Sequence, residues 1–483
     1  MIRTTSSILL ICFLFLFGSF SQAQENAGYV SQVIEAREQL VDELEVFAKW
    51  CTSRKLYAAA DTANRQIIVL DPDHPAARKS LRYRLSKGVW IQSASYRKPS
   101  DRNKDVVDEL ETRREAVVGE YRRRIFKLNT KFEDQINGEA REQTLLHLLR
   151  MLPEDVEVRA ALGEVLLDDQ WVLKETKTAL KRRELIPGRA KLCIDTAPVG
   201  DEAKPSALEE SLKLGWRAIK RTPHLRVAGT GTPEEVDRVL RTTLGASEFF
   251  RTLLDTDTLP MSGFTIFLLA GTGEKRQFLD NHPRVSPSIR DYLDSLKGAG
   301  VPGTAQSVEW SNTEIERMDR SVRGTISSMM DEAFVINVNH GWAIEGIGIY
   351  LTYQLIGTRL TYYTRDGRYV EDAESAKVQK RLKRRLYTTG SLWMDEARIH
   401  FEERRPPRLN FLMGRKVDAL TMQDRLWSYV FAAYLIEGCP DEVAPFLTLI
   451  GEGVQPHDAC RAVFKIELPS LEQRVIRWLH ETR

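Results

Sequence analysis

Apolar residues recur at three- and four-residue spacing through the first third of the chain. Residues 25–186 are rich in helix formers, and one stretch places several apolar side chains on a single helix face, namely Val33, Leu40, Leu44, Phe47 and Ala48. This spacing is typical of amphipathic helices. We therefore predict that residues 24–195 form a helical module.

One pattern recurs within this module at an offset of 81 positions. The matching pairs are Pro72 and Pro153, Arg78 and Arg159, Leu81 and Leu162, and Trp90 and Trp171. Each copy predicts an apolar helix, a proline-marked turn, a second helix and a short segment containing the tryptophan. The first copy resembles a tetratricopeptide-type helix pair, a unit that buries its apolar face by stacking on a neighbour. We interpret the two tryptophans as core anchors between the copies.

The hydrophobic period changes after residue 195. Residues 196–206 are turn-rich and poor in apolar side chains, so we predict a linker there. Beyond it, residues 225–228 and 264–269 have the pattern of short strands, and residues 233–254 that of a helix. The remainder is mainly helical, and residues 426–436 are apolar all round, as in a buried helix. The expected fold class is α+β, predominantly helical, with a small sheet in the second domain.

The N-terminus has the pattern of a secretory signal peptide. Arg3 precedes an apolar run over residues 8–17, and small residues at Ser21 and Ala23 suit a signal peptidase. The run is too short to span a bilayer, which needs about 20 apolar residues. We therefore expect residues 1–23 to be removed near Ala23, and the mature chain to be exported (periplasmic or extracellular) without a membrane span.

Composition narrows the possible partners. The chain of 483 residues has 70 Lys+Arg against 68 Asp+Glu, a formal charge of +2, which gives no electrostatic case for nucleic acid. The mature chain would keep four widely spaced cysteines, Cys51, Cys193, Cys439 and Cys460, in no metal-ligand pattern. Cys439 and Cys460 flank one predicted helical hairpin, and either a disulfide or two buried thiols fits that position.

The segment from Gly341 to Leu351 reads GWAIEGIGIYL. It resembles the W-x-x-E-G-x-A-x-Y-L helix of the peptidase MA-like group of gluzincin metallopeptidases, and the resemblance extends over residues 222–483. In that family the glutamate of this helix is the third zinc ligand, and Glu345 matches it. The resemblance implies a peptidase MA-like domain over residues 207–483.

The same resemblance implies that the metal site is lost. A zincin needs two histidines at i and i+4 with a glutamate beside the first, and this chain has no H-E-x-x-H. Aligned on the frame of residues 322–330, Arg323 and Ser327 take the ligand positions and Gly324 that of the general base. Arginine and neutral serine are not useful zinc ligands. We therefore expect no zinc and no catalytic residue, with His340 as a loop or helix-cap residue.

If the fold is retained, Arg323 and Glu345 converge on the vacated site. An unpartnered buried carboxylate costs several kcal/mol, so we predict a buried ion pair between them. The function expected by analogy is that of a pseudo-peptidase that binds a peptide or protein partner. Two alternatives remain open: an active zinc-dependent hydrolase with atypical ligands, and an architectural component of an envelope assembly.

Overall fold

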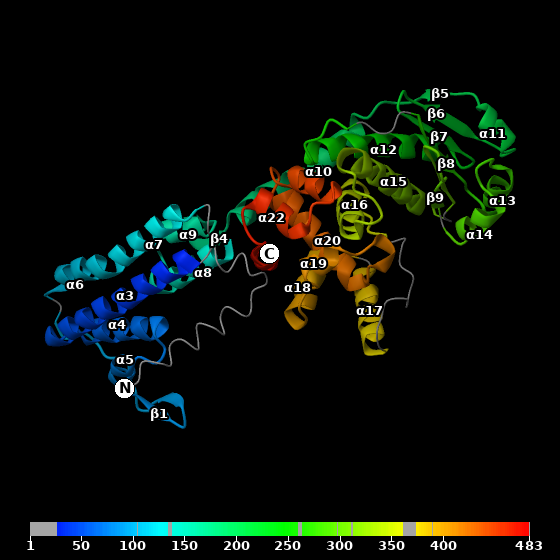
Figure 1. The fold of residues 1–483 in the computed structure, drawn as a ribbon. Helices are drawn as coiled ribbons and strands as arrows, with labels where there is room; N and C mark the ends of the chain where they lie inside the picture. Colours follow the sequence, from blue (N-terminus) through cyan, green and yellow to red (C-terminus); the bar gives the residue numbers. More distant parts are fainter. Residues whose placement is uncertain are drawn as a thin grey trace. The chain divides into compact units, whose positions relative to one another are not determined.

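The structure is a computed structural model that describes residues 27–103, 105–133, 138–258, 263–296, 298–310, 313–360, 373–388 and 390–482. The fold is α+β and predominantly helical, as predicted (Figure 1). The chain divides into two compact units, Met1–Glu164 and Val165–Arg483. The predicted signal peptide lies outside the described residues. Within the described part of the chain, no helix is both long enough and apolar enough to cross a membrane.

Two copies of one set of elements make up the first unit, and the second copy ends with a hairpin that belongs, from Val165 on, to the second unit. The first copy contains α3 (Ala27–Ser53), α4 (Tyr57–Leu70), α5 (Pro75–Ser80) and the hairpin of β1 (Tyr83–Ser86) and β2 (Val89–Gln92). The second contains α6 (Val107–Arg114), the π-helical segment η1 (Glu115–Gly119), α7 (Glu120–Lys131), α8 (Gly138–Met151), α9 (Val156–Ala161) and the hairpin of β3 (Glu164–Leu167) and β4 (Gln170–Leu173). Elements α8, α9, β3 and β4 each begin and end 81 positions after α4, α5, β1 and β2, which confirms the predicted duplication.

The recurring proline and arginine form the same contact in both copies. Arg78 Nε donates to the carbonyl of Pro72 over 2.8 Å, and Arg159 Nε donates to the carbonyl of Pro153 over 2.9 Å. Each short helix also has a side-chain cap, from His74 in the first copy and Asp155 in the second. The turn before each short helix is therefore fixed in the same way twice.

The two tryptophans are not core anchors, so that interpretation was wrong. Trp90 and Trp171 lie on β2 and β4 and are only half-buried. The indole N–H of Trp90 donates to Asp73 over 3.0 Å, and the Arg78 guanidinium lies over its ring. The core of the unit comes instead from the stacked helices, including Leu40, Leu44, Ile67, Tyr121 and Ile125. The strands β1 and β2 are not part of that stack, so Trp90 is not enclosed by it.

The first part of the second unit is an α/β part built around one mixed sheet. Its elements are α10 (Lys174–Asp195), β5 (Asp201–Glu202), α11 (Ala207–Ser211), β6 (Ala218–Arg221), β7 (Leu225–Gly229), α12 (Pro233–Leu253), β8 (Phe264–Leu268), α13 (Thr272–Asn281), α14 (Pro287–Asp294), β9 (Gly298–Gly300) and β10 (Gln306–Glu309). The strand order is β5-β6-β7-β8-β10-β9, with β7, β8 and β10 parallel and the other pairs antiparallel. The predicted strands at 225–228 and 264–269 and the predicted helix between them are confirmed as β7, β8 and α12.

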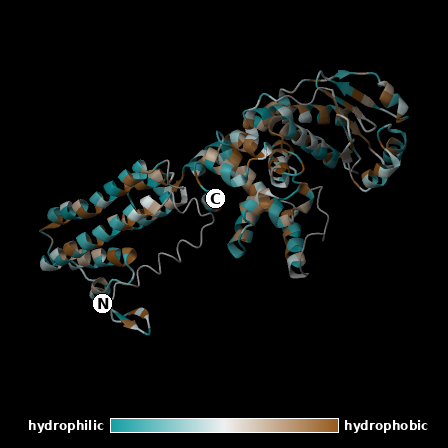
Figure 2. Cartoon of the chain, in the orientation of Figure 1, coloured by the Kyte–Doolittle hydropathy of each residue, from teal (hydrophilic) through white to brown (hydrophobic). Residues whose placement is uncertain are grey.

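A helical subdomain completes the second unit. Its elements are α15 (Glu314–Phe334), α16 (Gly341–Ile356), α17 (Ala373–Leu386), α18 (Trp393–Glu403), α19 (Leu409–Met413), η2 (Val417–Ala419), α20 (Met422–Ala433), η3 (Tyr434–Gly438), α21 (Val443–Gly451), α22 (Pro456–Phe464) and α23 (Leu468–Glu481). The main core of the unit lies around α16 and α20, and brown segments are visible in this part of the molecule in Figure 2. Residues 426–436 are all buried, which confirms the predicted core helix.

The expected linker at 196–206 does not separate the two compact units. The division falls at Glu164, because helix α10 belongs to the second unit. Ala179, Ile186, Ala190 and Cys193 of α10 share the core of α16 and α20. A Cβ on Gly245 of α12 would lie 2.8 Å from the Cα of Ile194, so α10 and α12 pack closely. The turn-rich stretch joins two parts of one unit.

The structure assigns the cysteines that the sequence left open. Cys51, Cys193, Cys439 and Cys460 are all buried free thiols. Burial raises the pKa of Cys51 to about 11 and that of Cys460 to about 12, so both thiols stay protonated at neutral pH.

Candidate functional site

Three of the four residues identified from the sequence lie on one helix. Arg323, Gly324 and Ser327 belong to α15, and Glu345 belongs to α16. Helix α15 begins after Thr313, whose hydroxyl accepts the N–H of Glu316, and ends at Val335 in the left-handed conformation. The two helices pack against each other, so side chains at the same level along the two helix axes can contact each other between them.

The predicted ion pair is confirmed. Arg323 Nη2 donates to Glu345 Oε1 over 2.6 Å. The side chains are 6% and 0% exposed. At this burial a single charge would be strongly penalised, so each partner is needed by the other.

A second arginine, which the sequence reasoning missed, binds the other carboxylate oxygen. Arg425 Nη1 of α20 donates to Glu345 Oε2, and both side chains are fully excluded from solvent. Arg425 and Glu345 are 80 positions apart, so no local spacing links them. The available signal was an arginine within the apolar helix pattern at 422–433, because a buried guanidinium requires a buried acceptor.

Arg323 has a further acceptor, whereas Arg425 depends on Glu345. Arg323 Nη1 donates to the carbonyl of Leu360 over 3.3 Å. Arg425 Nε and Nη2 are buried and have no hydrogen-bond partner among the described residues. The Glu345 carboxylate is therefore the principal acceptor that holds Arg425 in place.

Glycines of α16 allow this close approach. A Cβ on Gly346 would lie 2.3 Å from the carbonyl oxygen of Ser428, so α20 can reach Glu345 only where α16 has no side chain. A Cβ on Gly348 would lie 3.0 Å from Arg323 Nε. The small residues of the GWAIEGIG segment thus make room for both arginines.

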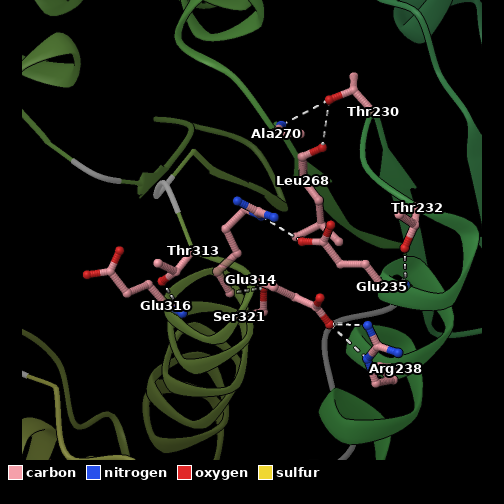
Figure 3. Close-up of polar contacts among 11 residues, drawn as sticks. Thr230, Thr232, Glu235, Arg238, Leu268, Ala270, Thr313, Glu314, Glu316 and Ser321 are labelled. Atoms are coloured by element: carbon pink, nitrogen blue, oxygen red, sulfur yellow. Dashed lines mark hydrogen bonds and ion pairs between the residues drawn. The ribbon is translucent and has the colours of Figure 1, made fainter.

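The first turns of α15 are fixed to the α/β part by ion pairs (Figure 3). Glu235 of α12 accepts from Arg317 over 2.6 Å in a buried pair, and Arg238 donates to Glu314 over 2.8 Å. Arg320 donates to Glu309 at the end of β10 over 2.8 Å. Burial raises the pKa of Glu309 to about 7, although the Arg320 guanidinium acts in the opposite direction.

The residues at this site do not fit zinc. Both oxygens of Glu345 already accept from guanidinium groups, and neither arginine is a ligand for a divalent cation. Among the described residues, no three or more His, Cys, Asp or Glu side chains are grouped so that they could hold a metal ion. His340 lies at the N-cap of α16, as expected, and its Nδ1 accepts the N–H of Asn337 over 3.2 Å.

The two remaining positions lie where side chains have space. Ser327 is half-buried, and a Cβ on Gly324 would meet nothing within 4 Å. Near the C-terminal end of α16, a hollow of about 310 Å³ is lined by Tyr353, Arg359, Leu360, Tyr387, Leu392 and Trp393 among others. Leu360, which accepts from Arg323, connects this hollow with the ion-pair cluster.

Comparisons of this chain with protein-family models, with curated proteins and with solved structures give no match.

Proposed function

We propose that residues 207–483 form a metallopeptidase-like domain that does not catalyse hydrolysis, and that the exported protein binds a peptide or protein partner. The observation that carries this proposal is the neutralisation of Glu345 by Arg323 and Arg425. Two fixed cations take the electrostatic role that a divalent ion has in an active relative of this type.

The energetics favour the arginines over a metal at this position. Binding of a cation to Glu345 would require both guanidinium groups to leave a carboxylate that they contact in a dry environment. Breaking one buried ion pair costs about 3–5 kcal/mol when the partner charge stays buried. Gly324 and Ser327 supply neither a general base nor a second ligand in exchange.

The hollow near the ion-pair cluster supports a binding role. Its volume of about 310 Å³ is comparable to that of small ligand sites, which start at roughly 300 Å³. Tyr387, which is 38% exposed, offers an aromatic surface, and Arg359, whose guanidinium lies over the ring of Tyr353, offers a cation. Such a lining suits a peptide segment with an apolar side chain and a carboxylate.

Metal analysis of the full mature chain tests the loss of the zinc site. Protein purified without chelators is analysed for zinc by elemental analysis, in the wild type and in Glu345→Gln. We expect less than stoichiometric zinc in both proteins. Stoichiometric zinc in the wild type that is lost in E345Q would instead identify an active-type metal site and overturn the proposal.

A graft tests whether α15 and α16 hold the zincin frame. The variant R323H/S327H/R425M places imidazoles at i and i+4 opposite Glu345 and removes the second arginine. We expect this variant to bind about one zinc ion per chain and to gain thermal stability with zinc. The matched control adds E345Q and should bind zinc much more weakly. A folded graft that binds no zinc contradicts the metallopeptidase-like arrangement.

The proposed export is tested separately. The N-terminal sequence of the protein secreted from its own cells is expected to begin at Gln24, after cleavage behind Ala23. Recovery of the chain with residues 1–23 intact would contradict export by signal-peptide cleavage.

A further inference from the structure

The hairpin of β1 and β2 exposes apolar side chains. Leu85, Val89 and Ile91 are 59%, 62% and 45% exposed. Val89 and Ile91 alternate along β2 and therefore share one face of the strand. The hairpin is labelled β1 in Figure 1, and Figure 2 colours parts of it as hydrophobic.

The outer edge of β2 also has unused backbone groups. The N–H of Ser93 donates to the carbonyl of Arg82, which marks these two residues as an inward-bonded pair of the ladder. Because such pairs alternate in antiparallel strands, Trp90 and Gln92 direct their backbone groups outward. No described residue forms a hydrogen bond with the carbonyl of Trp90 or the N–H of Gln92.

In the second copy of the hairpin, the edge of β4 that corresponds to the outer edge of β2 is covered by helices. In β4, which lies against α10 and α23, the N–H of Leu173 donates to Glu481 over 3.0 Å. The carbonyl of Trp171 accepts from Arg477 over 3.3 Å. These are the counterparts of the Gln92 N–H and the Trp90 carbonyl, 81 positions later. Arg477 and Glu481 are one helical turn apart on α23 and pair with each other.

Burial follows the same contrast. Val172 of β4 is 8% exposed, whereas its counterpart Ile91 of β2 is 45% exposed. The same strand position is therefore enclosed by helices in one copy and open in the other. The free hairpin keeps an apolar side chain at that position although nothing among the described residues encloses it.

We propose that the β2 edge, with Val89 and Ile91, is a docking surface for an amphipathic helix of a partner protein that carries Arg and Glu four residues apart. The arginine binds the Trp90 carbonyl, the glutamate accepts the Gln92 N–H, and apolar residues of the helix cover Ile91. In each chain the Arg477 and Glu481 pair of α23 is already used by β4, so a second copy does not supply this helix. The surface does not include Glu345, and the proposal does not depend on the function proposed above.

A peptide with the sequence of α23 provides a defined probe. Residues 468–481 are synthesised with a helix-stabilising lactam and a fluorophore, and the mature full-length chain is titrated against the peptide by fluorescence anisotropy. We expect saturable binding that weakens at least about tenfold in Ile91→Asp, because the aspartate must be buried under the helix. Replacing the residues of the peptide that correspond to Arg477 and Glu481 by alanine is expected to weaken binding comparably.

A substitution in the other hairpin provides the matched control. Leu166→Asp changes an exposed leucine of the other hairpin and should leave binding unchanged, with circular dichroism showing that both variants are folded. Absence of saturable binding up to millimolar peptide, or equal binding to I91D and the wild type, would overturn the proposal. A concentration-dependent dimer that is lost in I91D would overturn it in favour of self-association through β2.

Discussion

Arg425 donates to Glu345 from a helix 80 residues further along the chain, and neither side chain has any contact with solvent. Together with Arg323 it gives Glu345 a cation on each carboxylate oxygen. The three side chains come from α15, α16 and α20, so their charges connect the helices at the centre of the second unit. Stability of this subdomain therefore depends on completing the set.

Removal of the carboxylate alone is expected to destabilise more than removal of the whole cluster. Glu345→Leu leaves Arg323 and Arg425 buried without the anion that they share, and we expect a loss of about 3–5 kcal/mol in the free energy of unfolding. The triple variant R323M/E345L/R425M leaves no buried charge and should lose less. Urea unfolding measures both. Arg384→Met, an exposed position on α17, is the control and should change little. A triple variant less stable than E345L would contradict the electrostatic explanation.

Two glycines of neighbouring helices should respond oppositely to alanine. Gly346→Ala places a Cβ 2.3 Å from the Ser428 carbonyl oxygen, so we expect a loss of about 1–3 kcal/mol as α20 is displaced. Gly324→Ala meets no atom within 4 Å and lies inside α15, so we expect it to stabilise by about 0.5–1 kcal/mol. Chemical denaturation compares them. Similar effects of the two substitutions would show that α16 and α20 are not in close contact.

Thiol labelling distinguishes buried cysteines from a disulfide. The native mature protein is expected to react with none of its four thiols at pH 8, because all four are buried. After unfolding in denaturant without reductant, all four should react, as counted from the mass increase. Only two reactive thiols after unfolding would indicate a disulfide, and peptide mapping would identify the pair.

Stability should fall as the pH rises through the titration of Glu309. Burial raises the pKa of this carboxyl from 4.5 to about 7, so the folded state binds the proton more tightly than the unfolded state between these values. The free energy of unfolding then decreases with rising pH across that window, by on the order of 1–3 kcal/mol from this group. Glu309→Gln resembles the protonated form and should lose this contribution.

The measurement is urea unfolding of the wild type and E309Q at intervals from pH 4.5 to pH 8. The stability of the variant relative to the wild type is expected to increase with pH. A constant difference between the two proteins across this range would contradict the raised pKa of Glu309.

The sequence patterns predicted those elements whose cause is local, such as burial of a short apolar strand or a contact between residues close in the chain. The alternation and apolar runs near residues 225 and 264 gave strands β7 and β8, since both are enclosed in the sheet. The recurring Pro72 and Arg78 predicted a duplication because each pair makes the same contact within a few residues. Arg323 and Glu345 could be paired in advance because both positions follow from one resemblance.

The predictions failed where the outcome depends on packing between residues that are far apart in the sequence. The turn-rich stretch at 196–206 reflects local backbone preference, whereas the division at Glu164 depends on which core receives Ala179 and Ile186 of α10. Arg425 was missed because its acceptor lies on another helix. The position of Trp90 outside the core depends on a hairpin that extends beyond the helix stack, which residue type alone does not indicate.

Equivalent positions in the two hairpins, Ile91 and Val172, are expected to tolerate different substitutions during evolution, because only Val172 is buried. The side chain at 172 is restricted by the volume available beneath the helices that enclose it, so any bulkier or charged replacement would be selected against in every host. The side chain at 91 has no such intramolecular restriction and would drift toward polar residues in the absence of a ligand. If diverged relatives all keep an aliphatic residue at position 91, that conservation would indicate that the residue is covered by another protein.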